Sequence, residues 1–92
     1  MAIDLIYFDG CPHVDLARRN IEAALLARGW PPVWHEHNTS DPGVGAEWRR
    51  YPSPTVLVDG IDVTGGPAIS GSACRAGGPP SVSDIAAGFR SA

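Results

Sequence analysis

The chain has 92 residues, a length that accommodates one compact domain but not two. Its formal net charge is −3 and its seven basic residues are arginines scattered along the sequence, so it lacks the concentrated basic face that nucleic acid binding requires. No apolar run approaches the length of a membrane span, and we expect a single cytoplasmic domain of residues 1–92 with no nucleic acid or membrane partner.

The first third of the chain predicts a strand followed by a long helix. Residues 3–8 form a mostly apolar run, typical of a strand buried on both faces, and this run stops at Asp9. Apolar residues then recur at helical spacing, with Pro12 suited to the first helical position and Gly29 to the residue just past the end. The predicted buried face consists of Val14, Ala17, Ile21, Ala24 and Leu25, and the predicted solvent face carries Arg18, Arg19, Glu22 and Arg28.

The middle of the chain predicts two short elements. Residues 33–37 are interpreted as a second strand, because they contain tryptophan and valine among polar neighbours. Ser40 or Asp41 is expected to cap a short helix that has Pro42 in its first turn and that ends near Tyr51.

The last third predicts a hairpin, a loop and a final helix. Residues 56–58 and 61–63 are rich in β-branched side chains, and the Asp-Gly pair between them is typical of a tight antiparallel turn. Residues 65–80 contain five glycines and three prolines, which indicates a loop. Ser81, with Asp84 three residues later, predicts the cap of a helix that carries Val82, Ile85, Ala86 and Phe89.

The predicted element order is β-α-β-α-β-β-α, which indicates an α/β fold. A strand, a helix and a second strand in succession require a parallel pair, whereas the hairpin adds an antiparallel pair. We therefore expect a mixed sheet flanked by helices.

Cys11 is the candidate reactive residue, because it stands where the first predicted strand gives way to the first predicted helix. The amino end of a helix presents unpaired N–H groups and a partial positive charge, which favour an anion. In such settings the pKa of cysteine falls from about 8.5 to roughly 3.5–7.5, so we expect Cys11 to be ionised in part at neutral pH. His13 is expected to tune this acidity, and Asp15 opposes it. The alternative is a cysteine that only fills space in the core.

The sequence resembles the thioredoxin-like superfamily in its element order, in Cys11-Pro12-His13 after the first strand, and in Ser53-Pro54-Thr55 before the third. The resemblance implies that Pro54 is cis and faces the thiol, and that the backbone of Ser53 bonds a substrate chain. The expected substrate-binding residues are accordingly Pro12, Ser53, Pro54 and Thr55. Val14 stands where a resolving cysteine would complete a Cys-x-x-Cys motif, which excludes the ordinary dithiol cycle.

A narrower resemblance is to a group of small bacterial thioredoxin-like proteins, some of which are labelled as relatives of organomercurial lyases. The segments that carry it are the Tyr-Phe-Asp-Gly-Cys-Pro start, the Ser-Pro-Thr-Val-Leu-Val-Asp-Gly segment and the late Ser-Ala-Cys-Arg.

Two functions from different classes follow from these residues. In the first, Cys11 attacks a disulfide-containing protein or exchanges with a small thiol, Cys74 resolves the mixed disulfide, and no cofactor is needed. In the second, Cys11 and Cys74 hold a soft metal such as mercury, or a protein partner, without catalysis. Cleavage of a carbon–mercury bond is a variant of the second that requires Asp9 as proton donor.

Other residues leave further alternatives open. Asp9 is either a proton shuttle beside the thiol or a turn-forming residue before glycine. His35 and His37 lie on one face of the second predicted strand. They are either zinc ligands or, more simply, surface residues, and no bound metal is expected. The chain is expected to be a monomer or a weak dimer.

Overall fold

The computed structural model describes residues 1–64 and 79–91 of the chain. Cys74, together with most of the loop predicted at residues 65–80, lies outside the described residues. In the described part of the chain, no helix combines the length and the apolar character that crossing a membrane requires.

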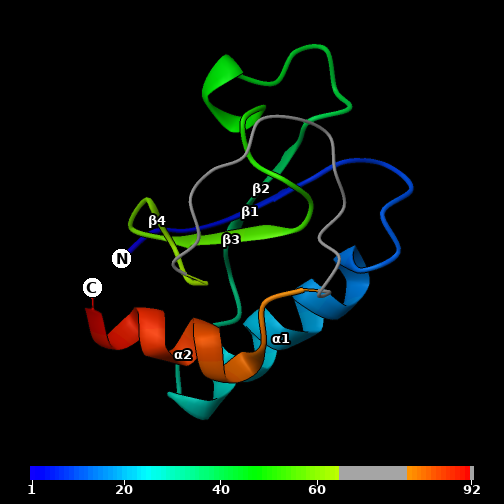
Figure 1. Ribbon diagram of the computed structural model, residues 1–92. Helices are drawn as coiled ribbons and strands as arrows, with labels where there is room; N and C mark the ends of the chain where they lie inside the picture. Colours follow the sequence, from blue (N-terminus) through cyan, green and yellow to red (C-terminus); the bar gives the residue numbers. More distant parts are fainter. Residues whose placement is uncertain (65–78, 92) are drawn as a thin grey trace.

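The described residues form a four-stranded mixed sheet with two helices (Figure 1). The strand order is β2-β1-β3-β4; β1 pairs with β2 in parallel, and both other pairs are antiparallel. The predicted α/β class and mixed sheet are therefore confirmed. In chain order the elements are β1 (Ile3–Tyr7), α1 (Val14–Ala27), β2 (His35–Asn38), the 3-10 turn η1 (Ala46–Trp48), β3 (Thr55–Val58), β4 (Ile61–Asp62) and α2 (Val82–Ser91).

Helix α1 buries the face that its periodicity predicts. All five residues of the predicted apolar stripe are buried, and Gly29 follows the helix at a φ of +73°. The start is two residues later than predicted, because His13 is the N-cap and Pro12 lies in the turn before it. Strand β2 is likewise shifted by one or two residues from the predicted range of 33–37.

The predicted helix ending near Tyr51 is wrong. Within residues 41–51 only the three residues of η1 are helical, because Gly45 ahead of them adopts an extended backbone at φ −62° and ψ 145°. The carboxylate of Asp41 also accepts the N–H of Gly43 at 2.9 Å, a local turn that competes with a helix. The order of the described elements is accordingly β-α-β-β-β-α, with a single 3-10 turn before β3.

The hairpin and the last helix form as predicted. Asp59 and Gly60 both have positive φ, at 51° and 82°, which matches the twist of a two-residue turn between antiparallel strands. At the start of α2 the hydroxyl of Ser81 accepts the N–H of Asp84 at 3.0 Å. The carboxylate of Asp84 accepts the N–H of Ser81 at 3.3 Å, which completes a reciprocal cap.

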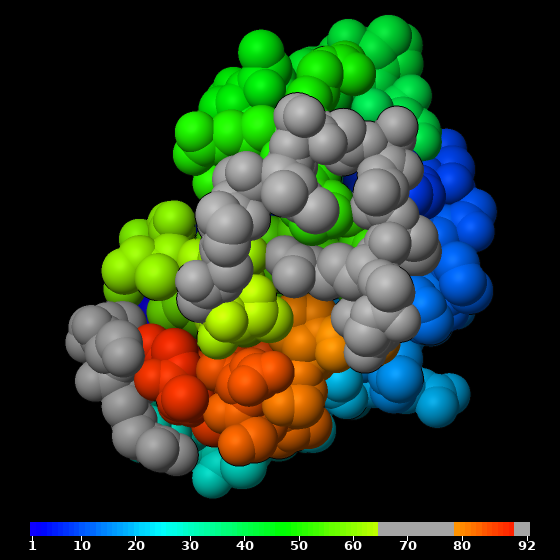
Figure 2. Space-filling model, in the orientation of Figure 1, coloured from blue at the N-terminus to red at the C-terminus, as the bar shows by residue number. Residues whose placement is uncertain are grey.

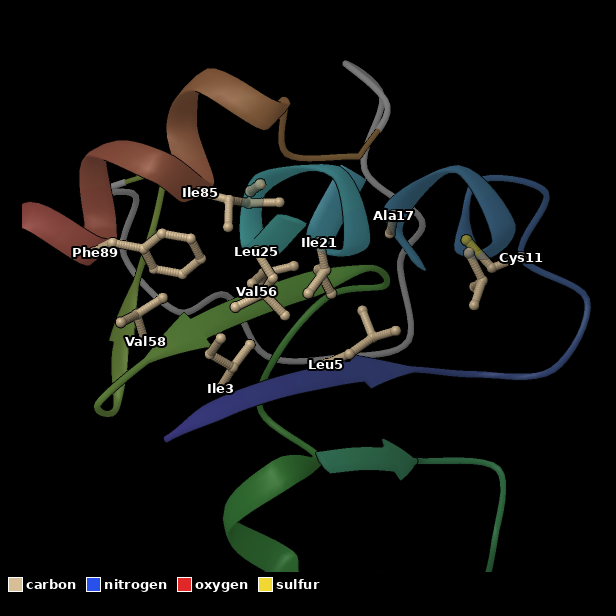
Figure 3. Close-up of a cluster of buried hydrophobic side chains, with 12 residues drawn as sticks. Ile3, Leu5, Cys11, Ala17, Ile21, Leu25, Val56, Val58, Ile85 and Phe89 are labelled. Carbon is tan, nitrogen blue, oxygen red and sulfur yellow. The ribbon is translucent and has the colours of Figure 1, made fainter. Parts of the chain in front are cut away.

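Both helices cover the same face of the sheet (Figure 1), and their apolar side chains meet those of β1 and β3 in one cluster. Figure 3 shows these side chains pointing toward one another between the helices and the strands. The buried members are Ile3, Leu5, Cys11, Val14, Ala17, Ile21, Ala24, Leu25, Val56, Val58, Ile85 and Phe89.

The opposite face is covered by the irregular chain that contains η1. Its smaller cluster consists of Ile6, Leu57 and Tyr51, with Trp48 packed against it. In Figure 2 the green segment that includes η1 and the orange and red helix α2 stand at opposite ends of the molecule. Side chains alternate between the two faces along β1, so that Leu5 enters the larger cluster and Ile6 the smaller one.

Candidate functional site

Cys11 lies in the turn that joins β1 to α1. Its carbonyl oxygen accepts the N–H of Val14 at 3.5 Å, and the residue is 9% exposed. Figure 3 shows Cys11 at the edge of the core cluster, beyond Ala17. The sulfur therefore lies close to the amino end of α1, where the sequence predicts it, at the border between core and surface.

The sulfur contacts a segment 42 residues away in the sequence. The thiol of Cys11 donates to the carbonyl oxygen of Ser53 at 3.7 Å, and Ser53 is joined to Pro54 by a cis peptide bond. The hydroxyl of Ser53, which is 1% exposed, accepts the N–H of Phe8 at 3.3 Å. The structure thus brings Cys11 and the segment before β3 together. The contact with Ser53 is made by the protonated thiol, since a thiolate has no hydrogen to donate.

A groove with a volume of about 280 Å³ opens beside Cys11. It is lined by Tyr7, Phe8, Asp9, Gly10, Cys11, Val14, Asp15 and Arg18. Of the six described residues among those predicted for catalysis and substrate binding, Cys11 alone lines this groove.

The other predicted site residues that the structure describes are outside the groove lining. Pro12 is exposed, and His13 is half-buried at the N-cap of α1. Ser53 and Pro54 are buried, as is Thr55, whose hydroxyl donates to the carbonyl of Pro52 at 2.6 Å. Cys74 lies outside the described residues, so its role as a resolving thiol stays a prediction.

Arg18 is a groove residue that the sequence pattern assigned to the solvent face. Its guanidinium binds Glu36 of β2 through two hydrogen bonds of 3.0 Å, and it binds Asp15 at 3.0 Å. It also lies over the ring of Tyr7, 5.1 Å from the centroid. The hydrogen bond from Arg18 lowers the pKa of Glu36, and the hydrogen bond to Glu36 raises the pKa of Arg18. The spacing of three residues along the helix indicates the ion pair between Arg18 and Asp15, but no sequence signal predicts the pair between Arg18 and Glu36.

Asp9 is held in a closed ring of hydrogen bonds at the ends of β1 and β2. Its N–H donates to the hydroxyl of Ser40, and its carboxylate accepts from the side-chain amide of Asn38, both at 2.9 Å. The N–H of Ser40 closes the ring on the side-chain oxygen of Asn38 at 2.9 Å. Parallel pairing places these two strand ends side by side, so the carboxylate of Asp9 keeps a defined position in the groove wall.

The histidines of β2 lie away from Cys11. His37 Nε2 is 2.8 Å from a carboxylate oxygen of Asp4, and its ring stacks on Trp48 with centroids 3.8 Å apart. His35 is exposed. Within residues 1–64 and 79–91 no group of three or more His, Cys, Asp or Glu side chains is placed to hold a metal ion.

Comparisons with known proteins add no assignment, since no family model, curated protein or solved structure matches this chain. The site itself combines a cysteine near a helix amino end, a groove that this cysteine lines, and charged residues in the groove lining. Cysteine in such a position is suited to nucleophilic attack on sulfur.

Proposed function

We propose that this protein is a thioredoxin-like redox protein that exchanges thiols and disulfides at Cys11. The observation that carries the proposal is the position of Cys11, which lines the groove and whose sulfur lies 3.7 Å from the carbonyl oxygen of Ser53. The thioredoxin-like assignment is supported by the same contact, because the segment before β3 packs against the thiol that follows β1. A parallel β1 and β2 joined through α1, followed by the β3–β4 hairpin and α2, follows the element order of that family except between β2 and β3, where the 3-10 turn η1 stands in place of a helix.

The reaction begins with loss of the Cys11 proton. The sulfur then releases its hydrogen bond to Ser53, and the unpaired N–H groups of the first turn of α1 stabilise the thiolate. The thiolate attacks one sulfur of a substrate disulfide, so that a bond forms between Cys11 and that sulfur while the other sulfur leaves as a thiolate and takes a proton from water. A small-molecule thiol then attacks the substrate sulfur of the mixed disulfide and releases Cys11 as a thiolate, which takes a proton from water. If Cys74 attacks instead, it bonds to the Cys11 sulfur and displaces the substrate sulfur as a thiolate, and two small-molecule thiols then reduce the Cys11–Cys74 disulfide.

Burial limits what can reach the sulfur. At 9% exposure Cys11 is approached through the groove, and a volume of about 280 Å³ suits a small disulfide or an extended chain segment. A disulfide embedded in a folded surface has no comparable access. We therefore expect small or extended disulfides to react faster than disulfides in folded proteins.

The first test is the rate at which Cys11 is alkylated by iodoacetamide, followed by peptide mass spectrometry between pH 5 and pH 9. We expect Cys11 to react faster at pH 6 than the cysteine of an unstructured model peptide, because the helix amino end favours the ionised sulfur. Cys11→Ser, which retains Cys74, serves as the control for alkylation elsewhere. A rate at Cys11 equal to or below that of the model peptide would contradict the proposal.

The second test is turnover of 2-hydroxyethyl disulfide with reduced glutathione. We expect turnover by the unaltered chain, its loss in Cys11→Ser, and a slower second step in Cys74→Ser if Cys74 resolves the mixed disulfide. Turnover that is unchanged in Cys11→Ser would overturn the assignment of the nucleophile. Stoichiometric capture of Hg²⁺ without any disulfide turnover would favour the metal-binding alternative instead.

A further inference from the structure

The charges on the groove wall are unevenly paired. Asp9 and Asp15 contribute two carboxylates to the groove lining, and Arg18 contributes the guanidinium. Glu36 adds a third carboxylate behind Arg18, so that among the described residues three negative charges face one positive charge. The substrate path to Cys11 is therefore acidic, although an arginine stands in it.

Arg18 is not available to a substrate anion. Its Nε and Nη2 donate to the two carboxylate oxygens of Glu36, and its Nη1 donates to Asp15, all at 3.0 Å. A carboxylate on a substrate would have to displace a bidentate partner that β2 already holds in place. The guanidinium thus acts as an internal counter-ion rather than as an anion receptor.

Asp9, by contrast, is oriented by groups that carry no charge. The amide of Asn38 and the hydroxyl of Ser40 hold it through its carboxylate and its N–H, and neither neutralises it. Asp15 is paired with Arg18, but its side chain is 90% exposed and Arg18 is shared with Glu36. Both carboxylates therefore project a negative field into the space from which a disulfide approaches Cys11.

From this arrangement we propose that the groove selects disulfides that carry a positively charged amine near the reacting sulfur, and that Asp9 and Asp15 determine this specificity. The inference rests on the proposed function, because it names the substrate class for the exchange at Cys11. With cystamine, for example, the Cys11 thiolate forms a bond to one sulfur, and cysteamine leaves as a thiolate that takes a proton from water. The carboxylates stabilise the ammonium groups during this step, and they repel a disulfide that carries carboxylates.

The test compares three disulfides of similar size: cystamine, which is cationic; 2-hydroxyethyl disulfide, which is neutral; and 3,3′-dithiodipropionate, which is anionic. Each rate constant with the full chain is divided by that of the same disulfide with a neutral cysteine peptide, so that differences in leaving group cancel. Because one Cys11 thiolate attacks all three, its degree of ionisation cancels from the ratios as well.

At low ionic strength we expect the normalised rate for cystamine to exceed that for 3,3′-dithiodipropionate by about tenfold or more, from charges a few ångströms apart across water. The ratio should fall toward one as salt is raised to about 1 M, where the screening length is near 3 Å. A ratio of one or less at low salt would overturn the inference while leaving the proposed function intact. Failure of all three disulfides to react with Cys11 would instead contradict the proposed function.

Two variants assign the effect to named residues. Asp15→Asn, at a highly exposed position, and Asp9→Asn, which retains an oxygen for the Asn38 contact, should each reduce the cystamine preference by about twofold to fivefold. Glu22→Gln is the matched control, because it removes the same charge from the exposed side of α1 outside the groove lining, and it should leave the preference unchanged. An equal reduction in all three variants would show that overall charge sets the preference, which contradicts the roles of Asp9 and Asp15.

Discussion

The two faces of the sheet are stabilised in different ways. The face under α1 and α2 buries a continuous apolar cluster, in which Leu5, Ile21 and Ile85 have no exposed surface. Among the described residues the opposite face buries a smaller cluster, and it also has polar and stacking contacts, such as the pair of Asp4 with His37. Burial of apolar area is the larger source of stability. We therefore expect the helix face to contribute most of the free energy of unfolding, and the opposite face mainly to keep the loops ordered.

The same division continues along β2, at the edge of the sheet. Glu36 points toward α1 and binds Arg18, whereas its neighbour His37 points to the other side and stacks on Trp48. Cys11 and its groove lie where the apolar cluster of the helix face ends and these polar contacts begin.

The largest expected effect tests the helix face with two adjacent leucines of α1. Leu25 is 2% exposed and Leu26 is 56% exposed. Leu25→Ala should lower the free energy of unfolding by about 3 kcal/mol, because it leaves a cavity in the cluster. Leu26→Ala should change it by less than about 0.5 kcal/mol. Urea denaturation measures both, and similar losses in the two variants would contradict the described burial of α1.

An intermediate effect is expected on the opposite face at Arg49. Its guanidinium donates to the carbonyls of Thr39, Asp41 and Pro42 at 3.2–3.3 Å, which holds the loop after β2. Arg49→Ala should cost about 1 kcal/mol and should speed hydrogen exchange at the N–H of Thr39, which bonds to Tyr7 at 2.7 Å.

Arg19→Ala, on the exposed side of α1, is the control for Arg49→Ala and should have little effect on either measurement. If Arg49→Ala destabilised the protein more than Leu25→Ala does, the ranking of the two faces would be reversed.

The smallest effect concerns Glu36, whose pKa is lowered by its hydrogen bond from Arg18. A carboxylate with a lowered pKa in the folded state stabilises the protein above the ordinary glutamate value of about 4.3, and this contribution is lost as the pH falls through the lowered value. Glu36→Gln should therefore cost about 0.2–1 kcal/mol at pH 7, a range that allows for the partial exposure of the pair.

The cost of Glu36→Gln should shrink as the pH is lowered toward 3, in denaturation curves recorded side by side with the unaltered chain. Glu22→Gln removes an exposed carboxylate without a described salt bridge. The difference in stability between this variant and the unaltered chain should not change as the pH is lowered. A cost that grows at acid pH would contradict the ion pair with Arg18.

Local patterns in the sequence were sufficient for much of the fold. The buried stripe of α1 follows from helical spacing, the hairpin from two residues that accept positive φ, and the cap of α2 from Ser81 and Asp84 three residues apart. The helix expected near residues 42–51 did not form, because an extended Gly45 and the contacts of Arg49 favour an irregular chain over its weak helical propensity.

The sequence by itself determined where Cys11 stands, between a buried strand and the amino end of a helix, because that placement depends only on neighbouring residues. What surrounds the sulfur was decided by the tertiary structure. The thiol of Cys11 contacts the carbonyl of Ser53, which is 42 residues away in the sequence. The amide that holds the Asp9 carboxylate belongs to Asn38, 29 residues away, and the carboxylate that binds Arg18 belongs to Glu36, 18 residues away. Their positions depend on how β1 pairs with β2 and β3, and no local pattern in the chain specifies that register.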